Sequence, residues 1–177
     1  INIGFSGNGR MHEAVGKLMA EVDAACYIID CLPNMNAAMV TERCVPLVKL
    51  LRKARPETPI VLVEDRRFAN SWLTPIKSKF HDDNHAALRK AYEQLRAAGV
   101  PHLHYLEGDK LLGNDTEGTT DASHPNDLGF LRQADAFESV REWYTSTMRA
   151  QHSHITDALS GRRLDSLEQC VAVDVIS

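Results

Sequence analysis

An aspartate and a histidine three residues apart, Asp121 and His124, are the side chains of this sequence best placed for acid–base chemistry. One turn of backbone can bring the carboxylate of Asp121 onto the Nδ1–H group of the His124 imidazole. Such a contact fixes the tautomer and stabilises the imidazolium that forms when Nε2 takes a proton. The pattern indicates a general base, and the alternative is a surface histidine beside an aspartate near a helix start.

A glycine-rich turn, Gly-Phe-Ser-Gly-Asn-Gly over residues 4–9, is open to several interpretations. Glycines there let backbone N–H groups approach a ligand, so Gly7 could donate to an oxyanion. The turn could bind a dinucleotide, with Asp30 about 20 residues further on, although the glycine spacing differs from that fingerprint. It could be a nucleophile elbow around Ser6, but Asn8 stands where that motif has glycine. A plain tight turn is the remaining alternative.

Asn34 follows an apolar run and directly succeeds Pro33. A side-chain amide at that place can donate a hydrogen bond to a developing oxyanion. The alternative is an ordinary turn residue after proline.

The remaining histidines and the cysteines do not indicate a metal site. His81 and His85 are spaced as helix neighbours without the adjacent glutamate of a zinc protease, and His102 and His104 share one strand face without a third ligand. The four cysteines form no Cys-x-x-Cys pair. We therefore predict no metal.

Strand-like and helix-like segments alternate along the chain. A continuous apolar run predicts a buried strand at residues 25–29, and further strand-like segments predict strands at 1–5, 59–63 and 102–106. Apolar residues at helical spacing predict helices at 11–22, 38–54, 80–98 and 127–149. This alternation predicts a parallel sheet with helices on both faces. Ligands of such sheets bind beyond the carboxyl ends of the strands, which selects the stretches 6–10, 31–36, 64–70 and 107–126.

Length and composition indicate one domain with a substantial core. The chain has 177 residues, of which 44% are hydrophobic and 25% charged. Its net charge of −4 argues against a broad nucleic-acid-binding surface. No apolar run approaches the roughly 18 residues of a membrane span. We assign residues 1–149 to the domain and 150–177 to a C-terminal extension, in which residues 171–176 could form an added strand or a tail.

Three segments, in order and spacing, resemble the conserved blocks of the SGNH (GDSL-like) hydrolase superfamily of esterases and acylhydrolases. Residues 2–9, Asn-Ile-Gly-Phe-Ser-Gly-Asn-Gly, are similar to the second block. Residues 31–34 look like the third block, which supplies an asparagine, and residues 121–130 look like the fifth. The resemblance covers residues 1 to about 145.

The resemblance implies a three-layer α/β/α, flavodoxin-like fold with a parallel sheet of order 2-1-3-4-5. It implies a Ser-His-Asp hydrolase of carboxylic esters, often of acyl groups on sugars, with a small-molecule ester as its partner and no cofactor. His124 would act as general base and then general acid, and Asp121 would orient it. The Gly7 N–H group and the Asn34 side chain would supply two of the oxyanion donors.

Two departures from the family pattern concern Met35 and the first block. Met35 stands where an aspartate often follows the third-block asparagine. The first block, with the nucleophilic serine and the first strand, has no counterpart, so we expect both upstream of Ile1. That strand would lie beside the strand at 25–29, where each unpaired buried backbone group costs about 1–3 kcal/mol. A strand from another chain, or direct pairing of its neighbours, are the alternatives.

Two other functions stay open from the sequence. An inactive SGNH-like domain could bind a small ester or sugar without cleaving it. A dinucleotide-binding α/β domain is the second alternative, but it leaves Asp121 and His124 without a role. Exposed sheet edges would favour a homo-oligomer. The sequence does not fix the compartment.

Overall fold

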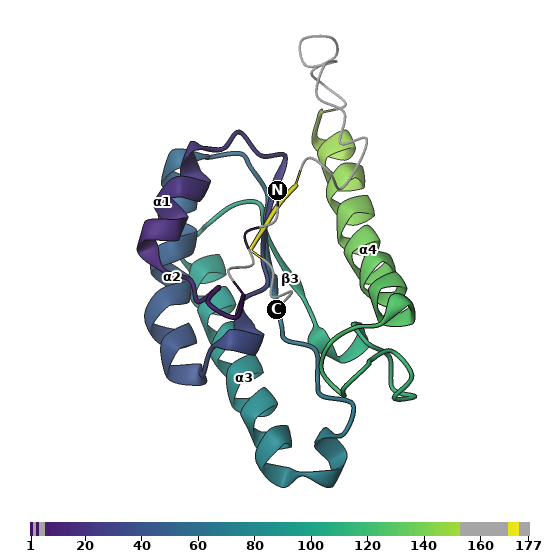
Figure 1. Ribbon diagram of the computed structural model, residues 1–177. Helices are drawn as coiled ribbons and strands as arrows, with labels where there is room; N and C mark the ends of the chain where they lie inside the picture. Colours follow the sequence, from purple (N-terminus) through teal and green to yellow (C-terminus); the bar gives the residue numbers. More distant parts are fainter. Residues whose placement is uncertain (2, 4–5, 153–169, 174–177) are drawn as a thin grey trace.

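The computed structural model describes residues 1, 3, 6–152 and 170–173, and within them strands and helices alternate (Figure 1). The strands are β1 (Cys26–Ile29), β2 (Ile60–Val63), β3 (Leu103–Leu106) and β4 (Cys170–Val173). The α-helices are α1 (Glu13–Glu21), α2 (Ala37–Ala54), α3 (Pro75–Ala97) and α4 (Asp127–His152). Short 3₁₀ helices are η1 (Leu32–Asn34), η2 (Ser71–Leu73) and η3 (Gly108–Lys110).

The four strands form one parallel sheet in the order β3-β2-β1-β4. In register, Tyr27 of β1 lies opposite Ile60 of β2, and Ile60 lies opposite Leu103 of β3. Because all strands run the same way, their carboxyl ends share one edge. The segments that follow β1, β2 and β3 therefore gather at that edge.

Helices cover both faces of the sheet, as Figure 1 shows, with α1, α2 and α3 on one side and α4 on the other. Alternate strand residues supply the two cores, because successive side chains point to opposite faces. Tyr27 and Ile29 pack with the first three helices, whereas Ile28 packs towards α4 and its Phe137. The predicted parallel α/β fold, with helices on both faces, is confirmed.

Most predicted elements lie within a few residues of their observed positions. The clearest difference is α3, which begins at Pro75 rather than at residue 80. Proline is well suited to the first helical turn, where its missing N–H group would have no partner. The strand predicted at 1–5 falls largely outside the described residues, since positions 2, 4 and 5 are not among them. The assignment of 150–177 to a separate extension stays a prediction, although α4 runs through His152.

The strand β4 comes from the predicted C-terminal extension and pairs in parallel with β1. Cys26 lies opposite Cys170, and Ile29 lies opposite Val173. The sequence predicts that this edge of β1 pairs with a strand from upstream, a strand from another chain or the neighbouring strand. In the structure, a later segment of the same chain supplies backbone partners there. Among the helices described, none is long and apolar enough to cross a membrane.

Candidate functional site

The Asp121 carboxylate and the His124 imidazole lie in direct contact, as their spacing predicts. Asp121 Oδ2 is 2.6 Å from His124 Nδ1. Asp121 Oδ1 accepts hydrogen bonds from the backbone N–H groups of Ser123, at 3.0 Å, and His124, at 2.7 Å. The backbone bonds bend the chain so that the carboxylate meets the ring. Both side chains reach solvent, with 54% of Asp121 and 43% of His124 exposed.

These contacts favour the ionised form of Asp121. Hydrogen bonds from the backbone and ring of His124, and from the backbone of Ser123, lower the pKa of the Asp121 carboxyl well below its usual range. A carboxylate on Nδ1 orients the ring so that Nε2 carries the lone pair. The pair can therefore accept a proton at Nε2 and stabilise the resulting imidazolium.

The loop that carries this pair is closed by its own hydrogen bonds. Thr119 and Pro125 form an isolated antiparallel bridge, and Asn126 donates from its side chain to the Glu117 carbonyl at 2.7 Å. Gly129, in the first turn of α4, allows the close approach, since a Cβ there would lie 2.1 Å from the Gly118 carbonyl oxygen. The structure thus joins the two ends of the loop at the start of α4.

Gly7 and Asn34 lie close together in the structure. Both come long before Asp121 and His124 in the sequence. Gly7 has a φ of +80°, in the left-handed region that favours glycine. A Cβ at Gly7 would lie 3.9 Å from Asn34 Oδ1. Asn34 ends η1, directly beyond β1, and its buried Nδ2 has no hydrogen-bond acceptor among the described residues. A buried amide donor without an acceptor is costly, which marks it as a candidate for a ligand oxygen.

Three further residues of the sequence analysis are Ser6, Met35 and Asp30, and the structure places each of them as follows. Ser6 is exposed with a φ of 45°, and its carbonyl faces the Asn8 amide at 3.5 Å. Met35 is buried in the core, and its carbonyl accepts a hydrogen bond from Asn84. Asp30, the carboxylate of the dinucleotide interpretation, is buried at the end of β1. With 8% of Asp30 exposed, little of its surface is open to the ribose of a bound dinucleotide.

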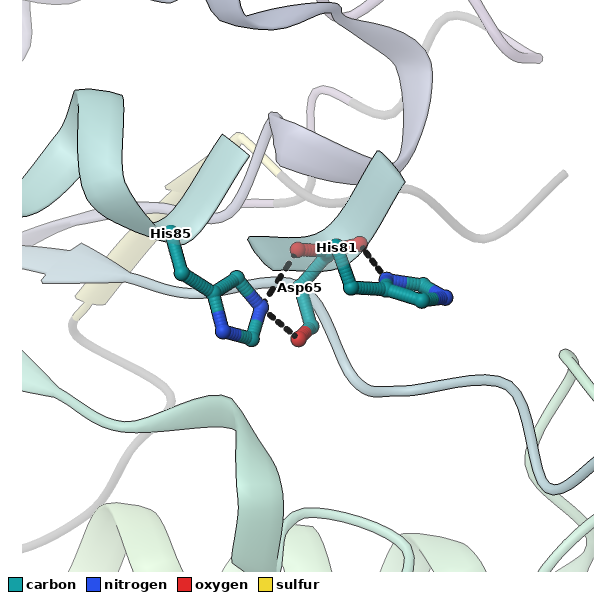
Figure 2. A group of neighbouring side chains, drawn as sticks. All are labelled: Asp65, His81 and His85. Carbon is teal, nitrogen blue, oxygen red and sulfur yellow. Dashed lines mark hydrogen bonds and ion pairs between the residues drawn. The ribbon is translucent and has the colours of Figure 1, made fainter. Parts of the chain in front are cut away.

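A second carboxylate–imidazole group, which the sequence analysis did not identify, lies beyond β2. Asp65 Oδ2 is 2.5 Å from His81 Nδ1, and His85 Nε2 is 2.9 Å from the Asp65 carbonyl oxygen and 2.7 Å from Asp65 Oδ1 (Figure 2). The side chains of Asp65 and His81 are 1% and 0% exposed. One ligand atom from each of the three residues lies within 4.8 Å of the others, so they form the candidate metal-binding group of the described part of the chain.

In this second group, Asp65 and His85 favour each other's charged forms. Burial alone would lower the pKa of His85, but the hydrogen bonds and charge of Asp65, with the charge of Glu64, raise it. Burial would raise the pKa of Asp65, yet the contacts with His81 and His85 lower it. Asp65 is therefore ionised beside a His85 ring whose protonated form is favoured.

Comparisons with known proteins agree with the observed fold. A family model described as the GDSL-like lipase/acylhydrolase family matches residues 1–142. A crystal structure described as a GDSL-like lipase from Bacteroides ovatus is 34% identical, with a TM-score of 0.72, over 76% of this chain and 40% of that one. The salicylyl-acyltransferase SsfX3 from a tetracycline biosynthetic pathway is 21% identical, with a TM-score of 0.62, over 78% of this chain and 42% of that one, which shows the shared fold. The chain thus spans about two fifths of each solved structure. No curated protein matches it.

Proposed function

Because the chain belongs to the GDSL-like lipase/acylhydrolase family, we propose that it carries the acid–base and oxyanion-binding part of a serine esterase site. The observation that carries the proposal is the 2.6 Å contact between Asp121 and the solvent-reaching ring of His124. A histidine oriented by a carboxylate and open to a substrate is the arrangement that general base catalysis requires.

In the proposed reaction, a serine hydroxyl attacks the ester carbonyl and His124 Nε2 takes its proton. The carbonyl oxygen becomes an oxyanion and accepts hydrogen bonds from the Gly7 N–H group and the Asn34 Nδ2 group. When the C–O bond breaks, His124 returns the proton to the leaving alcohol. Water then hydrolyses the acyl-serine in a second round of the same steps. Asp121 stays ionised throughout and orients the imidazolium.

The attacking serine is proposed to lie on the family's first block, outside the 177 residues, with its own backbone N–H group as a third oxyanion donor. Ser6 is the alternative within the chain. The proposed substrates are carboxylic esters, with acyl groups on carbohydrates as the first class to test.

Hydrolysis of p-nitrophenyl acetate tests the proposal. The assay compares the 177-residue chain with the protein at the full length that its gene encodes, each with and without His124→Ala. Turnover confined to the longer form, and lost with His124→Ala, supports a site in which this chain supplies the base and the first block supplies the serine. If the 177-residue chain itself is active and Ser6→Ala abolishes turnover, Ser6 is the nucleophile. Turnover that survives His124→Ala would contradict the role of His124.

A further inference from the structure

The segment directly beyond β2, residues 65–69, contacts the loop that carries Asp121 and His124. We propose that Arg66 is a positioning residue that docks this loop, and that the buried Asp65, His81 and His85 side chains hold the segment that presents Arg66. The catalytic meaning of the docking rests on the proposed function, whereas the docking itself can be tested without activity.

Two hydrogen bonds join the segment to the loop. Arg66 Nε donates to the carbonyl oxygen of Ser123 at 2.6 Å, and the Ala69 N–H group donates to the carbonyl oxygen of Ala122 at 2.8 Å. Ala122 and Ser123 are the two residues that separate Asp121 from His124. The backbone between the acid and the base is therefore held from the end of β2.

Arg66 differs sharply from its neighbour Arg67. Arg67 is partly exposed and forms ion pairs with Asp82, at 2.8 Å, and Asp109, at 2.7 Å. Arg66 is only 5% exposed, and no ion pair of Arg66 is found among the described residues. Arginine is rarely buried without strong acceptors. A charged donor directed at a loop carbonyl accounts for the burial of this guanidinium.

The cluster in Figure 2 fixes the backbone on both sides of Arg66. His85 Nε2 contacts the Asp65 carbonyl at 2.9 Å, and the Phe68 N–H group donates to His81 Nε2 at 3.1 Å. Both histidines lie on α3, one turn apart. The helix thereby holds the segment at residue 65, before Arg66, and at residue 68, before Ala69.

The same distances argue against a metal centre in this cluster. Two ligands about 2.0–2.1 Å from a tetrahedral zinc lie about 3.3 Å from one another. Asp65 is instead 2.5 Å from His81 Nδ1 and 2.7 Å from His85 Nε2, which are hydrogen-bond and ion-pair separations. His81 Nε2 already accepts the Phe68 N–H group, so Nδ1 carries the proton and has no lone pair for a metal.

Amide hydrogen exchange tests the docking directly. We expect Arg66→Met to speed exchange of the Ala69 N–H group at least about tenfold relative to the core amide of Leu62. Arg67→Met is the matched control, because it removes an adjacent guanidinium that pairs with Asp82 and Asp109 and not with Ala122 or Ser123, and it should leave that ratio unchanged. Arg66→Lys keeps the charge but lacks Nε, so it should fall between the two. An unchanged ratio in Arg66→Met would overturn the docking role.

Kinetics of the ester-hydrolysing form test the catalytic consequence. Displacing a catalytic group by about 1 Å can cost on the order of 100-fold in rate. We expect Arg66→Met to lower kcat by about 10- to 100-fold with KM within about twofold of the original, and Arg67→Met to change neither. Unchanged kcat in Arg66→Met, despite faster exchange, would overturn the positioning role. A wild-type protein without esterase activity would contradict the proposed function, and the exchange ratio would still decide the docking.

A zinc measurement tests the role given to the cluster. After purification in the presence of zinc and exhaustive dialysis, the protein should retain less than about 0.1 zinc per chain. Retention of one zinc per chain that His81→Ala and His85→Ala each abolish would show a metal centre. That result would overturn the hydrogen-bonded cluster as the device that holds the segment.

Discussion

Two aspartate–histidine contacts in this molecule have nearly the same length and opposite surroundings. Asp121 meets His124 at 2.6 Å in a solvent-exposed loop, and Asp65 meets His81 at 2.5 Å in the interior. In the interior pair, the second ring nitrogen of His81 accepts a backbone N–H group. In the exposed pair, 43% of the His124 side chain is open to solvent.

The difference teaches that a short carboxylate–imidazole distance does not by itself identify a catalytic pair. Exposure of the imidazole ring to solvent separates the two pairs. We expect changes in the exposed pair to affect turnover and changes in the buried pair to affect stability. The following predictions test that division, from the largest effect to the smallest.

Replacing the exposed base should have the largest effect on turnover. His124→Ala removes the proton acceptor and should lower kcat by about 10⁴-fold in the ester-hydrolysing form. Because the side chain is exposed, the free energy of unfolding should change by no more than about 0.5 kcal/mol. Urea unfolding and steady-state kinetics on the same preparation measure both. A large loss of stability would contradict the expectation that the exposed pair affects turnover and the buried pair affects stability.

Replacing the buried histidine should have the opposite signature. His81→Ala leaves the Asp65 carboxylate buried without one of its partners, which should cost about 3–5 kcal/mol in the free energy of unfolding. Urea unfolding followed by circular dichroism gives the value. A destabilisation below about 1 kcal/mol would show that this contact contributes little to stability.

Removing the candidate oxyanion donor should reduce turnover without disturbing the core. Asn34→Ala should lower kcat by about 10²–10³-fold, since oxyanion donors contribute that much. Asn36→Ala is a matched control, because Asn36 caps α2 by accepting from the Met39 N–H group at 3.0 Å. It should cost about 1 kcal/mol of stability and leave kcat unchanged. Equal kinetic effects of the two variants would refute an oxyanion role for Asn34.

The smallest expected effect is a pH dependence from buried His104. Burial, with the nearby charges of His102, Arg52 and Arg96, lowers the pKa of His104 to about 4. Between pH 6.5 and 4 the unfolded chain binds a proton that the folded chain does not, so this residue makes stability fall as pH falls.

With an unfolded-state pKa near 6.5 and a folded-state pKa of about 4, His104 should lower the free energy of unfolding by at most about 2 kcal/mol between pH 7 and 5. His85 acts in the other direction. Its raised pKa gives stabilisation that is complete below about pH 6.5 and declines as pH rises through the folded-state value. Urea unfolding at pH 7 and pH 5 gives the free energy of unfolding at each pH. The difference between the two values should be smaller in His104→Gln than in the parent. An equal difference would show that His104 does not contribute.

The exposed pair could be predicted from sequence because its geometry is local. Three residues separate Asp121 from His124, and one turn of backbone brings them together. The buried cluster could not be predicted in the same way. The His81/His85 spacing is visible, but Asp65 lies 16 and 20 residues before the two histidines, and only the packing of α3 against the end of β2 joins them.

The fold shows the same limit. The local sequence predicted β1, β2 and β3 because each is a short strand-like segment that a helix follows or precedes. Whether residues 171–176 pair with the sheet depends on which strand edge is available to them, and the local pattern does not contain that information. The position of β4 beside β1 therefore required the structure.

The pairing of β4 with β1 also bears on the order in which the chain folds. Register partners in β1 and β2 are 33 residues apart, as in Tyr27 and Ile60, whereas Cys26 and Cys170 are 144 residues apart. Closing a longer loop costs more chain entropy, and contacts between distant residues slow folding. We expect β1, β2 and α2 to assemble early and β4 to dock last, so that during synthesis the edge of β1 stays open until residues 170–173 have left the ribosome.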